Sequence, residues 1–391
     1  MLTSQNIVGW GVRVAPLGLL FGGLALVGMG QGQEGGSPGM AALRAMYERA
    51  SSEWPAMVVD EGVDAQELGL LPEVVHPEGN EPTRARGELG EMLFFDPRLS
   101  SSNQLACASC HDPDLGWADG RTVAFGHQRV PLKRNAPTAL YAGHWEHLFW
   151  DGRAASAEDL VVRVMLNEHE LRATREEVEA KFNAIPEYVA AFEEAYGAER
   201  VTMELLAKAV SVFMRTMQEG NSPFDTFMQG RYQALTDQQV WGLHLFRTKA
   251  RCMNCHSGPL LSDNLFHNTG LTLYGTDLED WGRYHVTKDP ADVGKFKTPT
   301  LRNVANTRPY MHHGLFESLE VTMHAYDGGM PDMRRRRGME DDPLFPTKSE
   351  LVHELHLTEE EKLAVIAFME SLSERHRVRR PPELPPGREV D

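Results

Sequence analysis

Two short stretches decide the fold of this chain: Cys107-Ala108-Ser109-Cys110-His111 and Cys252-Met253-Asn254-Cys255-His256. They hold all four cysteines, and each reads C-x-x-C-H, the attachment signature of c-type haem. Two thiols three positions apart can form thioethers with both vinyl groups of one porphyrin, and the following histidine then lies against the iron. The sequence therefore predicts two covalently attached haem c groups. Their predicted anchors are Cys107, Cys110, Cys252 and Cys255, with His111 and His256 as proximal iron ligands.

Two other interpretations of the cysteines stay open, namely zinc half-sites and redox dithiols. A tetrahedral zinc site favours a separated histidine pair or a second C-x-x-C, whereas each motif here supplies only adjacent ligands. The pattern therefore favours haem.

Length and composition narrow the class of protein. The chain has 391 residues, which suits two or three domains, and 41% hydrophobic with 24% charged residues is typical of a globular protein. Its 39 Lys and Arg against 56 Asp and Glu give a net charge of −17. Such a surface repels phosphate backbones, so we expect no nucleic-acid partner, although it could attract a small basic protein.

Residues 1–30 resemble an export signal. An apolar run over residues 14–30 ends in Gly28-Met29-Gly30, which is similar to a small-x-small cleavage site. The run is short for a membrane span, which favours a cleaved signal, and an uncleaved N-terminal membrane anchor is the alternative. Either interpretation predicts a periplasmic or otherwise exported protein.

The surroundings of the two motifs repeat each other. Gly90-Glu91-Met92-Leu93-Phe94 precedes the first, and Gly242-Leu243-His244-Leu245-Phe246 precedes the second. Each predicts a short helix whose Leu-Phe pair packs on the haem that follows, which indicates duplication of one unit. We therefore expect a mainly α fold of two cytochrome-c-like haem domains with few short strands. The expected parts are an N-terminal Gly-, Pro- and acid-rich extension (31–83), two haem domains (84–232 and 233–376) and a disordered tail (377–391).

Capping and apolar periodicity predict the longer helices. The capping pairs are Thr174 with Glu177, Thr236 with Gln239, and Thr358 with Glu361. The apolar stripes expected to face the core are Val178, Phe182 and Ile185; Leu206, Val210, Phe213 and Met217; and Val365, Met369 and Leu372. The basic run at 334–337 is expected to be a solvated loop or a partner contact.

The arrangement resembles the bacterial di-haem cytochrome c peroxidases and the related MauG-type enzymes. Four blocks carry the resemblance: Leu93-Phe94-Phe95-Asp96-Pro97-Arg98-Leu99-Ser100, Arg134-Asn135-Ala136-Pro137-Thr138, Phe149-Trp150-Asp151-Gly152-Arg153-Ala154, and Phe296-Lys297-Thr298-Pro299-Thr300-Leu301-Arg302-Asn303-Val304. With the two motifs they extend over about residues 84–372, in the order found in that family.

The resemblance implies two catalytic residues. Trp150 is similar to the family's tryptophan between the porphyrins, which relays electrons or holes, although a core tryptophan is the alternative. Glu170 falls where the family has the distal acid that moves a proton during peroxide cleavage, and Glu168 is its competitor. The chain departs from the family at Leu160, where a glutamine is common, and this puts the distal hydrogen bonding in doubt.

The resemblance also implies axial ligands beyond the two proximal histidines. His127 matches a histidine that ligates the first iron in the resting oxidised state, and an exposed loop histidine is an equal alternative. His144 and His147 are weaker candidates. Tyr326 falls at the distal position of the second iron and is similar to the MauG branch. Met323, one helical turn away, is the alternative ligand of the type that peroxidases of this family use.

An inter-domain calcium ion is implied as well. Asn135, Thr307 and Pro309 match the family's site, in which an amide oxygen and two backbone carbonyls supply hard oxygen donors. Residues in ordinary turns are the alternative.

The implied function is an exported peroxidase that reduces hydrogen peroxide to water. Its electrons would come from a small redox protein, a cytochrome c or a copper protein, through the second haem. The alternative is a MauG-like enzyme that oxidises Trp or Tyr residues of a partner protein through a high-valent bis-haem state, and a non-catalytic electron carrier ranks third. Family members are commonly dimers, so a homodimer stays open.

Overall fold

The computed structural model describes residues 39–218, 220–335, 337–374 and 379–386. Residues 39–391 cluster as one unit by their internal contacts. The export or anchor segment predicted at 1–30 lies outside the described residues. None of the helices in the described ranges has the length and apolar character needed to cross a membrane.

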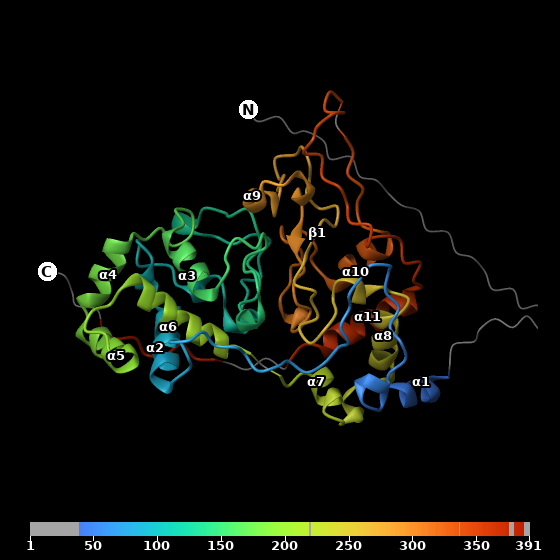
Figure 1. Cartoon of the computed structure of the whole chain (residues 1–391), viewed down its shortest axis with the longest axis horizontal. Helices are drawn as coiled ribbons and strands as arrows, with labels where there is room; N and C mark the ends of the chain where they lie inside the picture. Colours follow the sequence, from blue (N-terminus) through green and yellow to red (C-terminus); the bar gives the residue numbers. More distant parts are fainter. Residues whose placement is uncertain (1–38, 219, 336, 375–378, 387–391) are drawn as a thin grey trace, which may run out of the picture. The chain divides into compact units, whose positions relative to one another are not determined.

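The described chain is mostly helical, which confirms the predicted fold class. The first lobe is built from α2 (Arg84–Phe95), α3 (Ala157–Leu166), α4 (Arg175–Asn183), α5 (Pro186–Tyr196) and α6 (Met203–Thr216). The second lobe is built from α1 (Met40–Tyr47), α7 (Pro223–Met228), α8 (Asp237–Arg247), α9 (Tyr284–Thr287), α10 (Leu319–Asp327) and α11 (Glu359–Ser371). The strands found in these ranges are β1 (Phe266–His267) and β2 (Phe296–Lys297), an antiparallel pair in the second lobe (Figure 1).

The three helix starts that were predicted from capping residues are present in the structure. Reciprocal capping boxes open α8, at Thr236 and Gln239, and α11, at Thr358 and Glu361. At α4 the Thr174 hydroxyl accepts from the backbone N–H of Glu177.

The stripe predicted to follow Thr174 crosses a helix boundary. Val178 and Phe182 are buried on α4, which ends at Asn183. Ile185 is buried too, but it is the N-cap of α5, since Pro186 cannot continue the first helix and instead starts the second.

The same helix crossing occurs once in each lobe, at a glycine. A Cβ added to Gly90 of α2 would lie 2.1 Å from the carbonyl oxygen of Ala209 in α6. A Cβ added to Gly242 of α8 would lie 1.9 Å from the carbonyl oxygen of Ala364 in α11. Only a residue without a side chain lets the backbones approach this closely. This shared crossing supports the duplication that the repeated sequence indicates.

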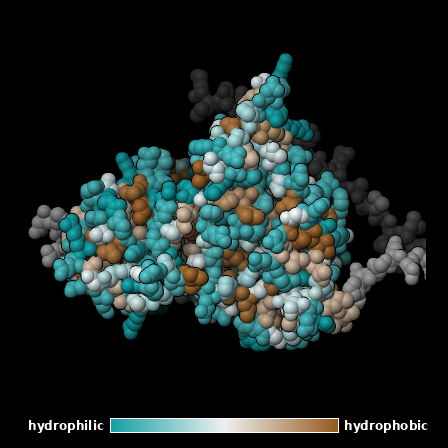
Figure 2. Space-filling view, in the orientation of Figure 1, coloured by the Kyte–Doolittle hydropathy of each residue, from teal (hydrophilic) through white to brown (hydrophobic). Residues whose placement is uncertain are grey.

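Two hydrophobic cores follow from these crossings. In the first, α2 and α6 bury Leu93, Phe94 and Phe213. In the second, α8 and α11 bury Phe246 and Phe368, and α1 and α7 add to the same core. The ring centroid of Phe224 in α7 lies 5.6 Å from that of Phe368. The second core therefore begins before the expected boundary at 232/233. The face drawn in Figure 2 is mainly hydrophilic, with small apolar areas between.

The N-terminal extension contacts both lobes. Its Glu67 accepts a hydrogen bond of 3.0 Å from Nε of the buried Arg247 in α8. Further along, the buried Asn80 donates to Glu158 in α3 at 2.8 Å. The described part of the extension is thus bonded to both lobes.

The described part of the C-terminal segment also packs on the first lobe, in contrast to the disorder expected for 377–391. Nη2 of Arg379 donates to Glu91 at 2.8 Å, and the carbonyl of Pro385 accepts from Arg98 at 3.0 Å. The guanidinium of Arg379 lies 5.1 Å from the ring centroid of Phe213. A cation over aromatic rings holds this proline-rich stretch to the surface.

Candidate haem sites and active site

Each C-x-x-C-H motif forms one tight helical turn. A 3-10 turn spans Cys107–Ser109 in the first lobe and Cys252–Asn254 in the second. The backbone N–H of His111 donates to the Cys107 carbonyl at 3.0 Å, and that of His256 donates to the Cys252 carbonyl at 2.8 Å. The turn brings two thiols and an imidazole to the same wall, the arrangement that one porphyrin requires.

The two histidines are oriented in the same way. Nδ1 of His111 lies 3.1 Å from the carbonyl oxygen of Trp117, and Nδ1 of His256 lies 3.0 Å from that of Leu261. A carbonyl oxygen only accepts, so Nδ1 carries the proton and Nε2 keeps a free lone pair. Burial lowers the pKa of both imidazoles, which favours the neutral form that binds iron.

A cavity of about 710 Å³ joins the two motifs. All four cysteines and both histidines line it, as do Phe94 and Phe246, the aromatic residues of the repeated helices. Of the two Leu-Phe pairs, Phe94 and Phe246 thus face the cavity, whereas Leu93 and Leu245 do not line it. The free Nε2 atoms, the paired thiols and the apolar walls fit haem c at each motif.

The two rival interpretations of the cysteines fit less well. Burial above all raises the pKa of Cys107 and of Cys252 to about 12, whereas a redox dithiol needs a thiol of lowered pKa. Among the described residues, the group that could gather around a metal ion is Cys255, Asp263 and His267. It takes one cysteine from one motif, so the paired thiols do not converge on a tetrahedral zinc site.

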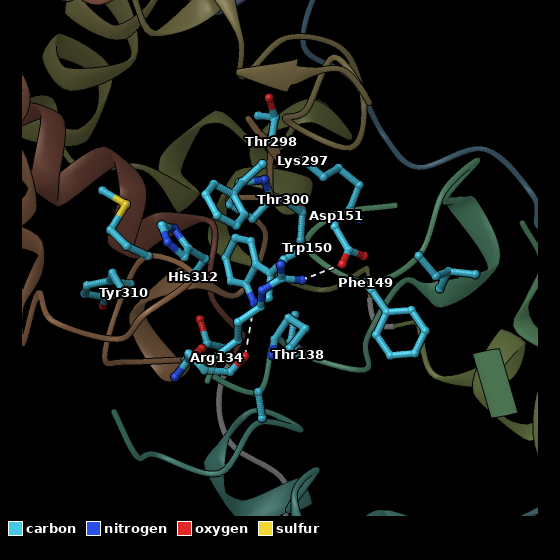
Figure 3. A pocket seen from close by; sticks show the side chains of 18 of the residues that line it. Arg134, Thr138, Phe149, Trp150, Asp151, Lys297, Thr298, Thr300, Tyr310 and His312 are labelled. Atoms are coloured by element: carbon cyan, nitrogen blue, oxygen red, sulfur yellow. Dashed lines mark hydrogen bonds and ion pairs between the residues drawn. The ribbon is translucent and has the colours of Figure 1, made fainter. Parts of the chain in front are cut away.

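Trp150 lies where the two lobes meet. Its indole Nε1 donates to the carbonyl of Asn135 at 3.0 Å, and its own carbonyl accepts from the N–H of Lys297 in β2 at 2.8 Å. Its ring centroid is 6.4 Å from that of His312 in the second lobe. Figure 3 shows the indole in the cavity lining between His312 and Asp151. The indole is thus bonded to the first lobe, while its ring approaches His312 and its backbone carbonyl bonds to β2 of the second lobe.

The loop that carries Trp150 depends on a glycine. Gly152 has φ +68°, and an added Cβ would lie 2.3 Å from Cζ of Phe266 in β1. Nη1 of Arg283 donates to the carbonyls of Asp151 and Gly152, both at 2.9 Å. A side chain here would push the loop away from the second lobe.

The two candidate acids have different surroundings. The Glu168 side chain is 79% exposed and pairs with the neighbouring His169 at 3.2 Å. The Glu170 side chain is 20% exposed and lines the cavity, where Nδ2 of Asn167 donates to its Oε1 at 2.8 Å. Burial raises the pKa of the Glu170 carboxyl, and the charge of Arg153 and the Asn167 hydrogen bond partly oppose this rise. Leu160 lines the same cavity.

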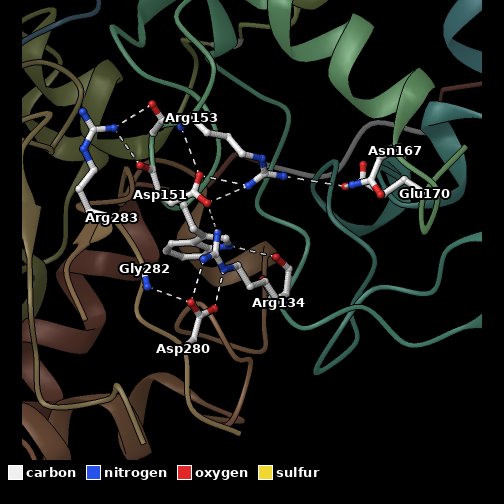
Figure 4. A network of polar contacts seen from close by, with 11 residues as sticks. Arg134, Asp151, Arg153, Asn167, Glu170, Asp280, Gly282 and Arg283 are labelled. Atoms are coloured by element: carbon white, nitrogen blue, oxygen red, sulfur yellow. Dashed lines mark hydrogen bonds and ion pairs between the residues drawn. The ribbon is translucent and has the colours of Figure 1, made fainter. Parts of the chain in front are cut away.

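Five alternating charges connect the second lobe to Glu170 (Figure 4). Asp280 accepts from Arg134 at 2.7 and 2.9 Å, and the same guanidinium donates to Asp151 at 2.7 Å. Asp151 in turn accepts from Nη1 of Arg153 at 3.1 Å. Nη2 of Arg153 lies 3.9 Å from Oε1 of Glu170. The network holds each charge beside an opposite one, which offsets the cost of burying them.

Both candidates for the second distal position line the cavity. Met323 and Tyr326 lie on the same side of α10, and Met323 is the more deeply buried of the two. The Tyr326 hydroxyl makes no hydrogen bond to any residue in the described ranges. The geometry therefore leaves both alternatives available to an iron at His256.

The other candidate histidines do not line the cavity. His127 is half-buried behind Gly126, and its Nδ1 is buried without a hydrogen-bond partner among the described residues. His144 bonds to Gln218 at 2.7 Å, and His147 packs on Phe266. A role for His127 as a ligand would require its loop to move.

The three residues proposed for calcium border the cavity. Asn135 is buried, and its Nδ2 donates to the carbonyl of Arg121 at 2.7 Å, so its Oδ1 is left to accept from elsewhere. Thr307 and Pro309 line the same cavity from the second lobe.

Sequence reasoning missed several polar residues at this site. Asp280 and Arg283 lie outside every quoted block, and nothing local marks them, because their partners are 146 and 132 positions away. Arg134 and Lys297 stood in quoted blocks, but their partners in space could not be assigned from the sequence.

The structure has two haem-attachment turns, and both face one cavity. Each turn follows a helix that crosses a second helix at a glycine. These features define a di-haem c-type protein. The chain belongs to the di-haem cytochrome c peroxidase family. A family model described as di-haem cytochrome c peroxidase matches residues 84–233. The chain is 33% identical over 335 residues to the cytochrome-c peroxidase IdrP1 of Pseudomonas sp. (strain SCT), covering 78% of this chain and 85% of that protein. It is 35% identical over 314 residues to the methylamine utilization protein MauG of Methylorubrum extorquens, covering 80% and 85%.

A solved structure agrees with these relatives. The crystal structure of a MauG-like protein associated with microbial copper homeostasis matches with a TM-score of 0.70 at 31% identity, over 77% of this chain and 93% of that one. The chain is therefore an oxidoreductase of a di-haem family that contains both peroxidases and MauG proteins.

Proposed function

We propose that the protein reduces hydrogen peroxide to water at the first haem site, which Cys107, Cys110 and His111 would hold. When bound, the two haem groups supply the iron that binds peroxide and the redox couples that hold its two oxidising equivalents. The overall reaction consumes one peroxide, two electrons and two protons and releases two waters. We assign the electrons to a small cytochrome c or copper protein that donates through the second site. The charge of −17 favours a basic donor.

Glu170 is the residue that moves the proton. Its carboxylate would take a proton from one peroxide oxygen and return it to the other, which would leave as water. Asn167 orients the carboxyl through Oε1, and Arg153 faces the same oxygen. Leu160, Phe149 and Leu171 line the cavity with apolar groups, which limits the water that could compete for the proton.

Trp150 is the proposed electron relay. The hydrogen bond from its indole to Asn135 fixes the ring, and the bond from Lys297 to its backbone carbonyl fixes the loop against the second lobe. A fixed aromatic ring at this place would divide the electron transfer between the two haem groups into shorter steps.

The observation that carries the proposal is the contrast between the two glutamates, and matched variants test it. We expect Glu170→Gln to slow peroxide consumption about a hundredfold or more at unchanged haem content, because acid–base groups contribute about that much. Glu168→Gln removes an exposed carboxylate two positions away and should keep near-native turnover. Near-native turnover of Glu170→Gln would assign the proton transfer to another group.

Tyr326 on the cavity wall favours a second candidate function, oxidation of Trp or Tyr residues in a partner protein. Phenolate is a hard anionic ligand and stabilises oxidised iron. Rapid steady-state turnover with reduced cytochrome c supports the peroxidase. Sluggish turnover, with a long-lived oxidised protein after one equivalent of peroxide, supports the protein-modifying enzyme. Unchanged spectra with cyanide after reduction of the second haem would exclude both and leave an electron carrier.

The remaining assignments complete the proposal. Asn135, Thr307 and Pro309 would hold a calcium ion, and Tyr326 rather than Met323 would ligate the second iron. His127 would ligate the first iron in the resting oxidised state. The protein works outside the cytoplasm, with residues 1–30 as its export signal or anchor. Size-exclusion chromatography with light scattering tests the homodimer.

A further inference from the structure

One buried cation in the cavity wall, Lys297, has no anion beside it among the residues that the structure describes. Lys297 lies in β2 with 9% of its surface exposed, and its side chain lines the cavity that joins the two motifs. Its Nζ lies 3.1 Å from the ring centroid of Trp145 in the first lobe. Within the described ranges, Nζ has no carboxylate partner and no hydrogen-bond acceptor.

Such an ammonium group is unfavourable by itself. Burial removes its hydration and shifts the pKa of Lys297 well below the usual value for lysine. The face of Trp145 offsets only part of this cost, because a cation–π contact satisfies none of the three N–H donors. Lysine is almost never fully buried unless an anion pairs with it. The side chain therefore indicates an anionic acceptor inside the cavity.

The other basic residues that line the cavity either form ion pairs with carboxylates or are exposed to solvent. Arg134 is held by Asp280 and Asp151, and Arg251 lies 3.5 Å from Asp60. Lys133 is exposed. Among these residues, Lys297 is thus the buried cation that does not already form an ion pair, so a carboxylate in the cavity could pair with it.

We propose that Lys297 binds a propionate carboxylate of one of the two haem groups. Each haem c carries two propionates opposite its thioether edge, so a carboxylate enters this cavity with the cofactor itself. Its oxygens accept from Nζ, which restores the hydrogen bonds that burial removes. The proposal rests on the presence of the haem groups and does not depend on peroxidase activity or on Glu170.

The position of Lys297 gives this contact a consequence. Its backbone N–H bonds to the carbonyl of Trp150 at 2.8 Å, so one residue contacts both the haem edge and the Trp150 loop. A positive charge beside a propionate stabilises the reduced haem relative to the oxidised one. Removal of the charge lowers the midpoint potential of that haem.

The test uses the holoprotein and a matched control. Lys297→Met keeps the length of the side chain and removes the charge. Lys295→Met removes a lysine two positions away that pairs with Asp292 at 3.1 Å and does not line the cavity. Spectroelectrochemistry of both haem groups is combined with redox difference infrared spectra of protein whose haem propionate carboxyls carry ¹³C.

The expected result is a lower midpoint potential of one haem and a displaced labelled carboxylate band in Lys297→Met, with neither change in Lys295→Met. Lys297→Arg should retain both wild-type signals, and Lys297→Gln serves if the methionine variant yields no holoprotein. Unchanged potentials and bands in the neutral variants overturn the proposal. A potential shift that follows buffer chloride or phosphate, without movement of a labelled band, also overturns it, because the anion would then be a free one.

Discussion

Replacement of Arg153 by Gln should shift the pH profile of peroxide consumption. Nη2 of Arg153 lies 3.9 Å from Oε1 of Glu170, and a unit charge at that distance is worth about 1 to 4 kcal/mol between water-like and protein-like dielectrics. The two side chains are 31% and 20% exposed, so solvent screening favours the lower end.

The sign follows from the groups that face the carboxyl. Burial raises the pKa of Glu170, while Arg153, the Asn167 hydrogen bond and His169 lower it. Loss of the Arg153 charge therefore raises the pKa further. The carboxylate is the form that accepts the peroxide proton, so activity at the acidic end declines at a higher pH. We expect the acidic limb of the rate profile to move to higher pH.

The assay is stopped-flow peroxide consumption across the pH range, with haem content fixed by absorbance. Arg153→Lys keeps a positive charge and should restore most of the profile. Arg163→Gln removes an exposed arginine that pairs with Asp159 at 2.8 Å on α3, and it should leave the profile unchanged. An Arg153→Gln profile that superimposes on the wild type would refute the assignment of Glu170 as the base that Arg153 influences.

Three further variants test the fold, the second iron and the interface between the lobes. Gly90→Ala should lower the free energy of unfolding by about 1–3 kcal/mol, since its Cβ would meet the Ala209 carbonyl at 2.1 Å. Gly87→Ala on the same helix meets nothing within 4 Å and should raise it by about 0.5–1 kcal/mol in denaturant titrations, so equal effects would contradict the crossing. Tyr326→Phe should change the spectrum and potential of the second haem while Met323→Leu does not, and the reverse result would make Met323 the ligand. Burial raises the pKa of Asp280, but the Arg134 ion pair outweighs it and lowers the pKa to about 2. A lowered pKa contributes stability above the usual value near 3.8 that is lost as the pH falls toward 2, so Asp280→Asn should remove about 2 kcal/mol of pH-dependent stability. Acid unfolding curves of equal slope would refute this pairing.

The sequence was most informative where the chemistry is local. The C-x-x-C-H turns, the capping boxes at Thr236 and Thr358, and the positions of Phe94 and Phe246 depend on neighbours within a few residues. The choice between Glu168 and Glu170 could not be made in this way, because it depends on which carboxyl the fold buries. Resemblance, rather than periodicity, favoured Glu170.

Features that depend on contacts between distant segments could not be predicted from the sequence. Asp280 and Arg134 are 146 positions apart, and no motif marks Asp280 as a partner. The assignment of α7 to the second core depends on the contact between Phe224 and Phe368, which are 144 positions apart in the numbering. His127 had suitable spacing along the chain, yet spacing could not show that its ring lies behind the cavity wall.

Denaturing mass spectrometry of the matured protein tests the central claim most directly. Covalent attachment predicts a polypeptide heavier by two haem groups, with Cys107, Cys110, Cys252 and Cys255 all unreactive toward thiol reagents because each is a thioether. A mass increase of one haem or none, or a cysteine pair that still reacts as free thiols, would contradict the assignment of two haem sites to this cavity.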